Sequence, residues 1–265
     1  MMEEIFLKWK IDPQQPLGLI FDVDETLFNN EKDIFQAYEF LLSSRRIGIT
    51  KEENFSGQDL FDIIGRVKKK YGIIDSVDQL VLERREKYIE LLRRTDSPVK
   101  EGVREVFRFL NENKDILNIR LVYATSSEKA FTDIILKRVF HCCGLESHIE
   151  NPDSFFYHNE RGECAATCWK PGEKKKPDPQ VYLKTLEKIG LPTSQCMAFE
   201  DSKSGFLSAQ ASGLNTVVVP SPWSVDCFKG HEYNRVSDQG VLKLKTLTDF
   251  VPFLQMLKKH KMISI

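Results

Sequence analysis

The sequence predicts an α/β fold whose core is a doubly wound parallel sheet and whose first strand is followed by an inserted all-helical domain. Short apolar runs recur along the chain, and each is followed by a polar turn and a helical pattern, as in parallel sheets. Residues 31–96 break this alternation, because they contain only helical patterns. The length of 265 residues exceeds that of most single domains, so a core with a second unit is expected.

Four apolar runs are expected to form buried strands: Leu17–Phe21, Leu121–Ala124, Met197–Phe199 and Thr216–Val219. Asp178 and Pro179 have the residue types of an N-cap and a first helical position, and they predict a helix that extends to about Lys188. Residues 203–212 form another helical pattern, which Gly213 ends. Strands that alternate with helices in this way predict a parallel sheet covered by helices on both faces.

The inserted segment contains three helical patterns, at about 31–46, 57–71 and 76–94, and no convincing strand. We therefore divide the chain into a catalytic core of residues 1–30 and 97–265 and a helical cap of residues 31–96. Residues 150–175 lack periodicity and are expected to form a long loop.

Composition narrows the class of protein. The chain has 38 basic and 39 acidic residues, so its net charge of −1 provides no long-range attraction to nucleic acid or anionic membranes. No apolar run approaches the ~18 residues that span a bilayer, and the acidic N-terminus does not resemble a secretory signal. Six cysteines in a chain of this length do not suggest a disulfide framework. We expect a cytoplasmic protein with no nucleic-acid or membrane partner, and we favour a monomer.

Two carboxylates follow the first predicted strand. Asp22 and Asp24 are two residues apart, so continued strand geometry places both side chains on one side. Open α/β sheets bind their ligands at this end of the strands. Two adjacent acids repel each other unless a cation or a shared proton lies between them. Mg²⁺ is the cation that fits, because it takes oxygen ligands and also neutralises the charge of a phosphate. The alternative is an acidic turn that only caps a helix.

Three further groups of polar residues lie directly after other predicted strands or in a loop. Glu200 and Asp201 form a second acid pair, which can supply metal ligands. Residues 125–127, Thr-Ser-Ser, precede a helix and form an anion site of hydroxyl and N–H groups. Lys176 can bridge a nucleophile and a phosphate as a point charge. Each signal alone has an ordinary explanation, namely helix capping for the acids and hydroxyls and a solvated surface for the lysine.

Together, these patterns resemble the haloacid dehalogenase superfamily over most of the chain, from about Leu17 to Pro222. The four motifs are Phe-Asp-Val-Asp-Glu-Thr-Leu (21–27), Ala-Thr-Ser-Ser (124–127), Lys-Pro-Asp-Pro (176–179) and Phe-Glu-Asp-Ser-Lys-Ser-Gly (199–205). The last two motifs and the helical insert resemble the β-phosphoglucomutase-like subgroup, which has a helical cap. Glu25 departs from that subgroup, which usually has glycine there.

The resemblance implies a Rossmann-like core and a Mg²⁺-dependent phosphatase that hydrolyses a small phosphorylated metabolite. Asp22 would form an aspartyl-phosphate, and Asp24 would act as general acid and base. Thr125 and Lys176 would bind and stabilise the transferring phosphoryl group. Phosphate-binding candidates are Ser126, Ser127 and Asn30, and the implied Mg²⁺ ligands are Asp22, Asp24 (through its carbonyl), Glu200 and Asp201.

Two alternatives remain open. A sugar-phosphate mutase of the β-phosphoglucomutase type would need a histidine near Ile34 and a basic residue near Gln58, although Lys68 or Arg66 could replace the latter. Because both expected residue types are absent, hydrolysis is favoured. A catalytically silent binding protein on the same fold is the other alternative.

Overall fold

A computed structural model describes residues 2–48, 60–94, 98–222, 224–237 and 240–263. The chain forms two compact units, one of Met1–Phe28 with Pro98–Ile265 and the other of Asn29–Ser97. The first unit is an α/β structure and the second consists of helices.

The α/β unit is built on a six-stranded sheet with the order β3-β2-β1-β4-β5-β6, in which every described pairing is parallel. The strands are β1 (Leu17–Phe21), β2 (Ile119–Thr125), β3 (Thr167–Cys168), β4 (Cys196–Glu200), β5 (Asn215–Val218) and β6 (Val241–Lys243). From central β1 the chain adds β2 and β3 on one side, then β4, β5 and β6 on the other. The strand order therefore reverses beside β1, where open α/β sheets bind their ligands.

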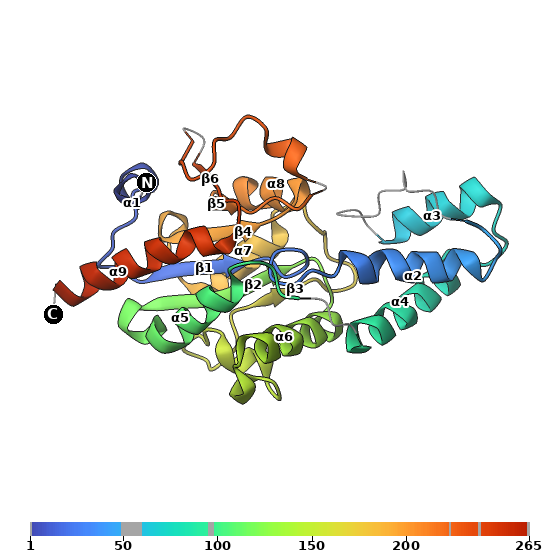
Figure 1. The fold of residues 1–265 in the computed structure, drawn as a ribbon, viewed down its shortest axis with the longest axis horizontal. Helices are drawn as coiled ribbons and strands as arrows, with labels where there is room; N and C mark the ends of the chain where they lie inside the picture. Colours follow the sequence, from blue (N-terminus) through green and yellow to red (C-terminus); the bar gives the residue numbers. More distant parts are fainter. Residues whose placement is uncertain (1, 49–59, 95–97, 223, 238–239, 264–265) are drawn as a thin grey trace. The chain divides into compact units, whose positions relative to one another are not determined.

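Helices cover both faces of this sheet, as the doubly wound prediction requires. Helix α5 (Val103–Leu117) packs against α6 (Lys129–Cys143) and α9 (Val251–Ile263), whereas α7 (Gln180–Ile189) packs against α8 (Lys203–Ala211). Figure 1 shows α5 and α6 below the sheet and α8 above it. A further helix, α1 (Met2–Trp9), precedes β1 and packs on α9.

Aromatic side chains fill the core beneath the carboxyl ends of β1 and β4. All five β1 residues are buried, and Phe21 stacks on Phe199 of β4 with 4.1 Å between ring centroids. Phe107 of α5 and Phe250 meet these two rings edge-on from the helical layer. Such buried rings each contribute about 1.5–3 kcal/mol, so they fix the strand ends that position the site.

Several element boundaries differ from the sequence prediction. The strands β3 and β6 were not predicted, and β3 lies within residues 150–175, which also contain the 3₁₀ helix Pro152–Phe155. Asp178 is not the N-cap of α7, because Pro179 occupies that position. The Asp178 carboxylate instead accepts a hydrogen bond from the N–H of Gln180 at 3.0 Å. Gly213 follows α8 with φ +75°, as predicted.

The second unit contains α2 (Glu31–Ser43), α3 (Leu60–Tyr71) and α4 (Val77–Arg94), and no strand occurs among its described residues. Apolar residues at helical spacing form its core, which includes Tyr38, Leu41, Leu42, Ile63, Ile64, Val67, Leu80 and Val81. Helix α2 ends earlier than its predicted limit of residue 46, and residues 57–59 of the second predicted helix lie outside the described residues.

No helix in the described part of the chain is both long enough and apolar enough to cross a bilayer.

Candidate active site

Asp22 is held at the carboxyl end of β1, directly beside β4. Its N–H donates to the carbonyl of Phe199 at 2.9 Å, which continues the pairing of the two strands by one residue. The residue is 7% exposed, and its carboxylate accepts hydrogen bonds on both oxygens, from Lys176 Nζ at 2.6 Å and from Thr26 Oγ1 at 3.1 Å. The first predicted carboxylate is therefore buried and held by two hydrogen bonds.

Lys176 joins the ends of three adjacent strands. Its ammonium donates to Asp22 Oδ1 at 2.6 Å, to Glu200 Oε1 at 2.7 Å and to the carbonyl of Ala124 at 2.8 Å. An ammonium has three donors, so these contacts use all of them. The interpretation of Lys176 as one of three surface lysines is wrong, because its side chain is only 5% exposed.

The hydroxyls after β2 meet the second carboxylate. Asp24 Oδ2 accepts from Ser127 Oγ at 2.7 Å and from Thr125 Oγ1 at 3.3 Å. Thr125 Oγ1 also accepts the N–H of Ser127 at 3.0 Å. Ser126 has a different place, since its hydroxyl accepts the backbone N–H of Lys176 at 3.2 Å and so ties the lysine segment to this loop.

Three carboxylates form what we call the acid cluster: Asp22, Glu200 and Asp201. Their ligand oxygens all lie within 4.8 Å of one another, and all three residues are buried. Glu200 Oε2 is buried and has no hydrogen-bond partner among the described residues. This donor set fits a hard divalent cation, because such ions take carboxylate oxygens and would satisfy the remaining buried oxygen. The Asp24 carboxylate is outside the cluster and faces the hydroxyls instead.

The pKa shifts of the acid cluster and of Lys176 also favour a bound cation. Burial raises the pKa of Asp22 to about 7, with Glu200 and Asp24 adding to the rise and Lys176 opposing it. Burial also raises the pKa of Asp201 well above its usual value, and the charges of Asp22 and Glu200 add to this rise. Burial alone would lower the pKa of Lys176, but the attraction of Asp22 and Glu200 outweighs it and raises that pKa. The cluster thus has a deficit of positive charge that a bound cation would correct.

Asn30, a predicted phosphate-binding residue, belongs to the helical unit. It is buried immediately before α2, where its Nδ2 donates to Tyr88 Oη at 2.7 Å. The structure therefore shows a packing contact within this unit for Asn30.

The positions relevant to the mutase alternative also lie in this unit. Ile34 is partly buried and packs against its hydrophobic core, and Gln58 lies outside the described residues. Lys68 Nζ donates to the carbonyls of Ile73, Ile74 and Asp75 at 2.6–3.1 Å, so it holds the turn after α3. The three donors of the Lys68 ammonium are thus used within this unit.

Sequence reasoning missed two residues that hold Glu200 in place. Tyr182 of α7 is fully buried, and its hydroxyl donates to Glu200 Oε1 at 2.5 Å. Gly205, in the first turn of α8, leaves the space that the Glu200 carboxylate occupies, since an added Cβ would lie 1.8 Å from Oε2. The available signal for Tyr182 was its place in the helical pattern of positions 181, 182, 185, 186 and 189, which is the buried face of α7.

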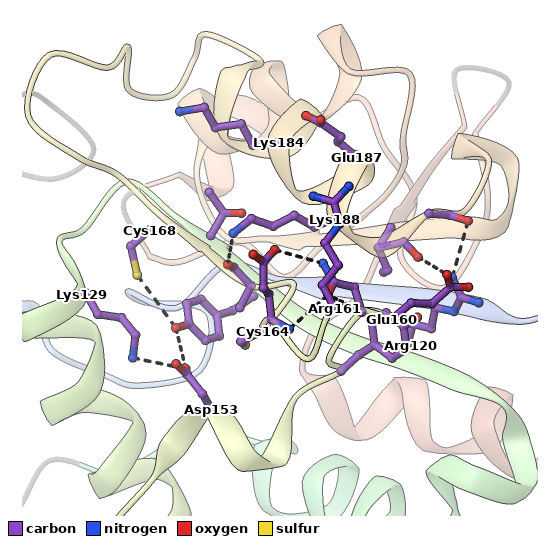
Figure 2. A pocket seen from close by; sticks show the side chains of 18 of the residues that line it. Arg120, Lys129, Asp153, Glu160, Arg161, Cys164, Cys168, Lys184, Glu187 and Lys188 are labelled. Carbon is purple, nitrogen blue, oxygen red and sulfur yellow. Dashed lines mark hydrogen bonds and ion pairs between the residues drawn. The ribbon is translucent and has the colours of Figure 1, made fainter.

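Residues 150–175 line a separate polar cavity of about 840 Å³ with the C-terminal half of α7 (Figure 2). None of the predicted site residues lines it. Several of its charges neutralise one another, since Lys129 pairs with Asp153 and Lys184 pairs with Glu173. The predicted site residues therefore lie outside the lining of this cavity.

Comparison with known proteins identifies the family. A family model described as haloacid dehalogenase-like hydrolase matches residues 17–213. The chain therefore belongs to the haloacid dehalogenase-like hydrolase family, and the resemblance seen in its motifs is confirmed. Protein CbbY of Rhodobacter capsulatus is 27% identical over 217 residues, which cover 78% of this chain and 86% of that protein. The phosphorylated carbohydrates phosphatase of Thermotoga maritima is 26% identical over 208 residues, covering 76% of this chain and 83% of the phosphatase.

Solved structures show the same fold. CbbY from Rhodobacter sphaeroides, in complex with phosphate, has a TM-score of 0.66 at 16% identity, and the match covers 91% of this chain and all of CbbY. A β-phosphoglucomutase from Clostridium difficile has a TM-score of 0.63 at 14% identity, and the match covers 94% of this chain and all of the mutase. At these identities the likenesses show the fold alone, and they agree with the predicted fold class.

Proposed function

We propose that this hydrolase is a Mg²⁺-dependent phosphatase that acts on a small phosphorylated metabolite, with Asp22 as the nucleophile. The observation that carries the proposal is the Lys176 ammonium, which contacts Asp22 at 2.6 Å and Glu200 at 2.7 Å inside a buried acid cluster. Such an arrangement orients one carboxylate and balances charge around it, which is what phosphoryl transfer requires.

The residues that would hold Mg²⁺ are Asp22, Glu200, Asp201 and, through its backbone carbonyl, Asp24. When bound, Mg²⁺ would neutralise the phosphate charge that the carboxylates otherwise repel. Lys176 would reduce the same repulsion, because its ammonium is already fixed against Asp22.

The proposed reaction has two displacements. An Asp22 oxygen attacks phosphorus and the bond to the ester oxygen breaks, while Asp24 gives its proton to the departing oxygen. Water then attacks the phosphorus of the aspartyl-phosphate and gives a proton to Asp24, and the bond to Asp22 breaks. Thr125 and Ser127, which already donate to Asp24 Oδ2, would hold that carboxyl group in line with the reacting oxygen.

Phosphorylated sugars are the substrate class that the relatives favour. One relative at 26% identity is named as a phosphatase of phosphorylated carbohydrates. A CbbY variant has been solved with xylulose 1,5-bisphosphate, although at 16% identity that structure shows only the fold in common. We extend this class to the present chain as part of the proposal, and we propose residues 31–96 as the cap that selects the substrate.

Phosphate release from a panel of phosphorylated metabolites tests the proposal. We expect Mg²⁺-dependent release from sugar phosphates, loss of release on chelation, and severe loss in both Asp22→Asn and Asp24→Asn. Mass spectrometry of acid-quenched wild-type protein should show one added phosphoryl group on the peptide that contains Asp22. A protein that binds these compounds without releasing phosphate would be the silent binding protein of the same fold, and the phosphatase proposal would be wrong.

The mutase alternative is tested with β-glucose 1-phosphate, Mg²⁺ and a bisphosphate primer. We expect inorganic phosphate to form faster than glucose 6-phosphate. Ile34, near the position where the mutases carry histidine, cannot transfer a proton. Faster formation of glucose 6-phosphate would overturn the hydrolase assignment in favour of the mutase.

A further inference from the structure

Asp201 differs from the other two members of the acid cluster in how its carboxylate is held. The carboxylates of Asp22 and Glu200 each accept hydrogen bonds from two side chains, one of which is the Lys176 ammonium. Among the described residues, no hydrogen bond or ion pair reaches the carboxylate of Asp201. Its direction is therefore set by its own backbone, so the groups that fix this backbone also fix a proposed metal ligand.

The segment that follows β5 binds the backbone at this position. Val219 N–H donates to the carbonyl of Glu200 at 2.8 Å, which continues the pairing of β4 and β5 by one residue. The next carbonyl, that of Asp201, accepts the hydroxyl of Ser224 and, at 3.4 Å, the N–H of Ser221. Both serines are buried, so the Ser224 hydroxyl is the main donor that the structure provides to this carbonyl.

The side chain of Ser224 does not have the role that its position in the chain favours. Ser224 is the N-cap of the 3₁₀ helix Val225–Phe228, yet its side chain makes no capping hydrogen bond with that helix. A serine at an N-cap ordinarily accepts an N–H of the following turn. Here its hydroxyl donates to Asp201 and lies 3.2 Å from the hydroxyl of Ser221. The helix is anchored by Phe228, which is buried in a cluster with residues of β5 and β6, so the hydroxyl has a fixed position.

We propose that Ser224 is a positioning residue for Asp201, and that its hydroxyl adapts the acid cluster to Mg²⁺. Mg²⁺ requires nearly octahedral oxygen ligands at about 2.0–2.1 Å, whereas Ca²⁺ accepts a variable number of oxygens at longer distances. A small rotation of the Asp201 backbone therefore harms a Mg²⁺ site more than a Ca²⁺ site. This inference rests on the proposed function, because it requires the cluster to bind a divalent cation.

Calorimetric titration of the metal-stripped protein with Mg²⁺ and with Ca²⁺ tests the inference without an activity assay. Ser224→Ala should weaken Mg²⁺ binding about tenfold, because the buried carbonyl of Asp201 loses its main donor and the backbone can turn. Ca²⁺ binding should weaken by less than about threefold, since that ion tolerates displaced ligands. Asp201→Asn, which removes a charge from the cluster, should weaken the binding of both ions.

Ser212→Ala is the matched control. Ser212 has the same exposed fraction as Ser224, 7%, and its hydroxyl also donates to a backbone carbonyl, that of Ser208 at 2.8 Å. It lies at the opposite end of α8 from Asp201. The control should lose a similar amount of thermal stability and should bind Mg²⁺ with the affinity of the wild type.

A preferential loss of Mg²⁺ affinity in Ser224→Ala is a result that a purely structural role would not produce. The inference is wrong if this variant binds Mg²⁺ within about twofold of the wild type, if it loses affinity for both ions equally, or if Ser212→Ala loses as much. If thermal melts show that Ser224→Ala does not fold, Ser221→Ala replaces it, because it removes the hydroxyl next to that of Ser224. That variant should weaken Mg²⁺ binding about threefold, and unchanged binding would refute the inference. Failure of the wild-type protein to bind Mg²⁺ would instead refute the metal-dependent function itself.

Discussion

The contact between Gly205 and Glu200 provides the sharpest test of the site geometry. Gly205 lies in the first turn of α8, and its N–H donates to the N-cap hydroxyl of Ser202 at 3.1 Å. An alanine Cβ at this position would lie 1.8 Å from Glu200 Oε2 and 2.4 Å from Oε1. Ordinary van der Waals contact begins at 3.4 Å, so the carboxylate would have to move by about 1.6 Å.

Such a movement would disturb the contacts that organise the site. Glu200 Oε1 is 2.7 Å from Lys176 Nζ and 2.5 Å from Tyr182 Oη, and neither hydrogen bond tolerates a shift of this size in a direction away from the donor. Breaking a buried ion pair costs about 3–5 kcal/mol, whereas replacing glycine by alanine inside a helix stabilises by about 1 kcal/mol. The expected net loss in the free energy of unfolding is therefore about 2–4 kcal/mol.

Activity should fall further than stability alone explains. Because Lys176 loses one of its anchors and Glu200 leaves the cluster, we expect kcat/KM for phosphate release to fall about 100-fold at a temperature where the variant is folded. Gly65→Ala is the matched control, since Gly65 lies inside α3 and an added Cβ there meets no atom within 4 Å. That variant should be as stable as the wild type or slightly more stable. Wild-type activity and melting temperature in Gly205→Ala would refute the described Glu200 position.

Three further outcomes are expected. Tyr182→Phe removes one donor to a buried carboxylate but keeps the ring, so kcat should fall about tenfold with little change in KM. A kcat equal to that of the wild type would mean that the hydroxyl is dispensable. Ser127→Ala removes the 2.7 Å hydrogen bond that orients Asp24 and should lower kcat about tenfold with little change in KM. An unchanged kcat would contradict this role for Ser127. In the metal-free protein the pKa of Asp22 rises from 3.8 to about 7, so the folded state holds a proton that the unfolded chain releases between these values. Relative to Asp22→Asn, the free energy of unfolding should therefore fall as the pH rises through this interval. Mg²⁺ should bind more weakly below about pH 7, because the proton competes with the cation for the carboxylate. Thermal melts with and without Mg²⁺ measure both effects.

Long periodic segments were predictable because their burial is encoded locally. The apolar run of β1 was predicted with its observed bounds, and the three helices of the inserted unit were found from their apolar spacing. The edge strand β3 has two residues and β6 has three, which is too short for a periodic signal. These strands exist because neighbouring strands provide hydrogen-bond partners, and a single sequence does not show which segments become neighbours.

The sequence by itself determined which residue types end up at one edge of the sheet. Parallel strands point the same way, so Asp22, Thr125 and Glu200, each at or directly after the end of a strand, had to converge once the alternation of strands and helices was recognised.

Only the tertiary structure decided which atoms of these residues touch. Lys176 donates its three hydrogen bonds to two carboxylates and a carbonyl. The Glu200 side chain occupies the space that Gly205 leaves. Glu25 has its buried charge balanced by Lys100, 75 residues away in the chain. These contacts join segments far apart in sequence, and they depend on side-chain conformation and packing in a dense interior, which no local pattern of residues encodes.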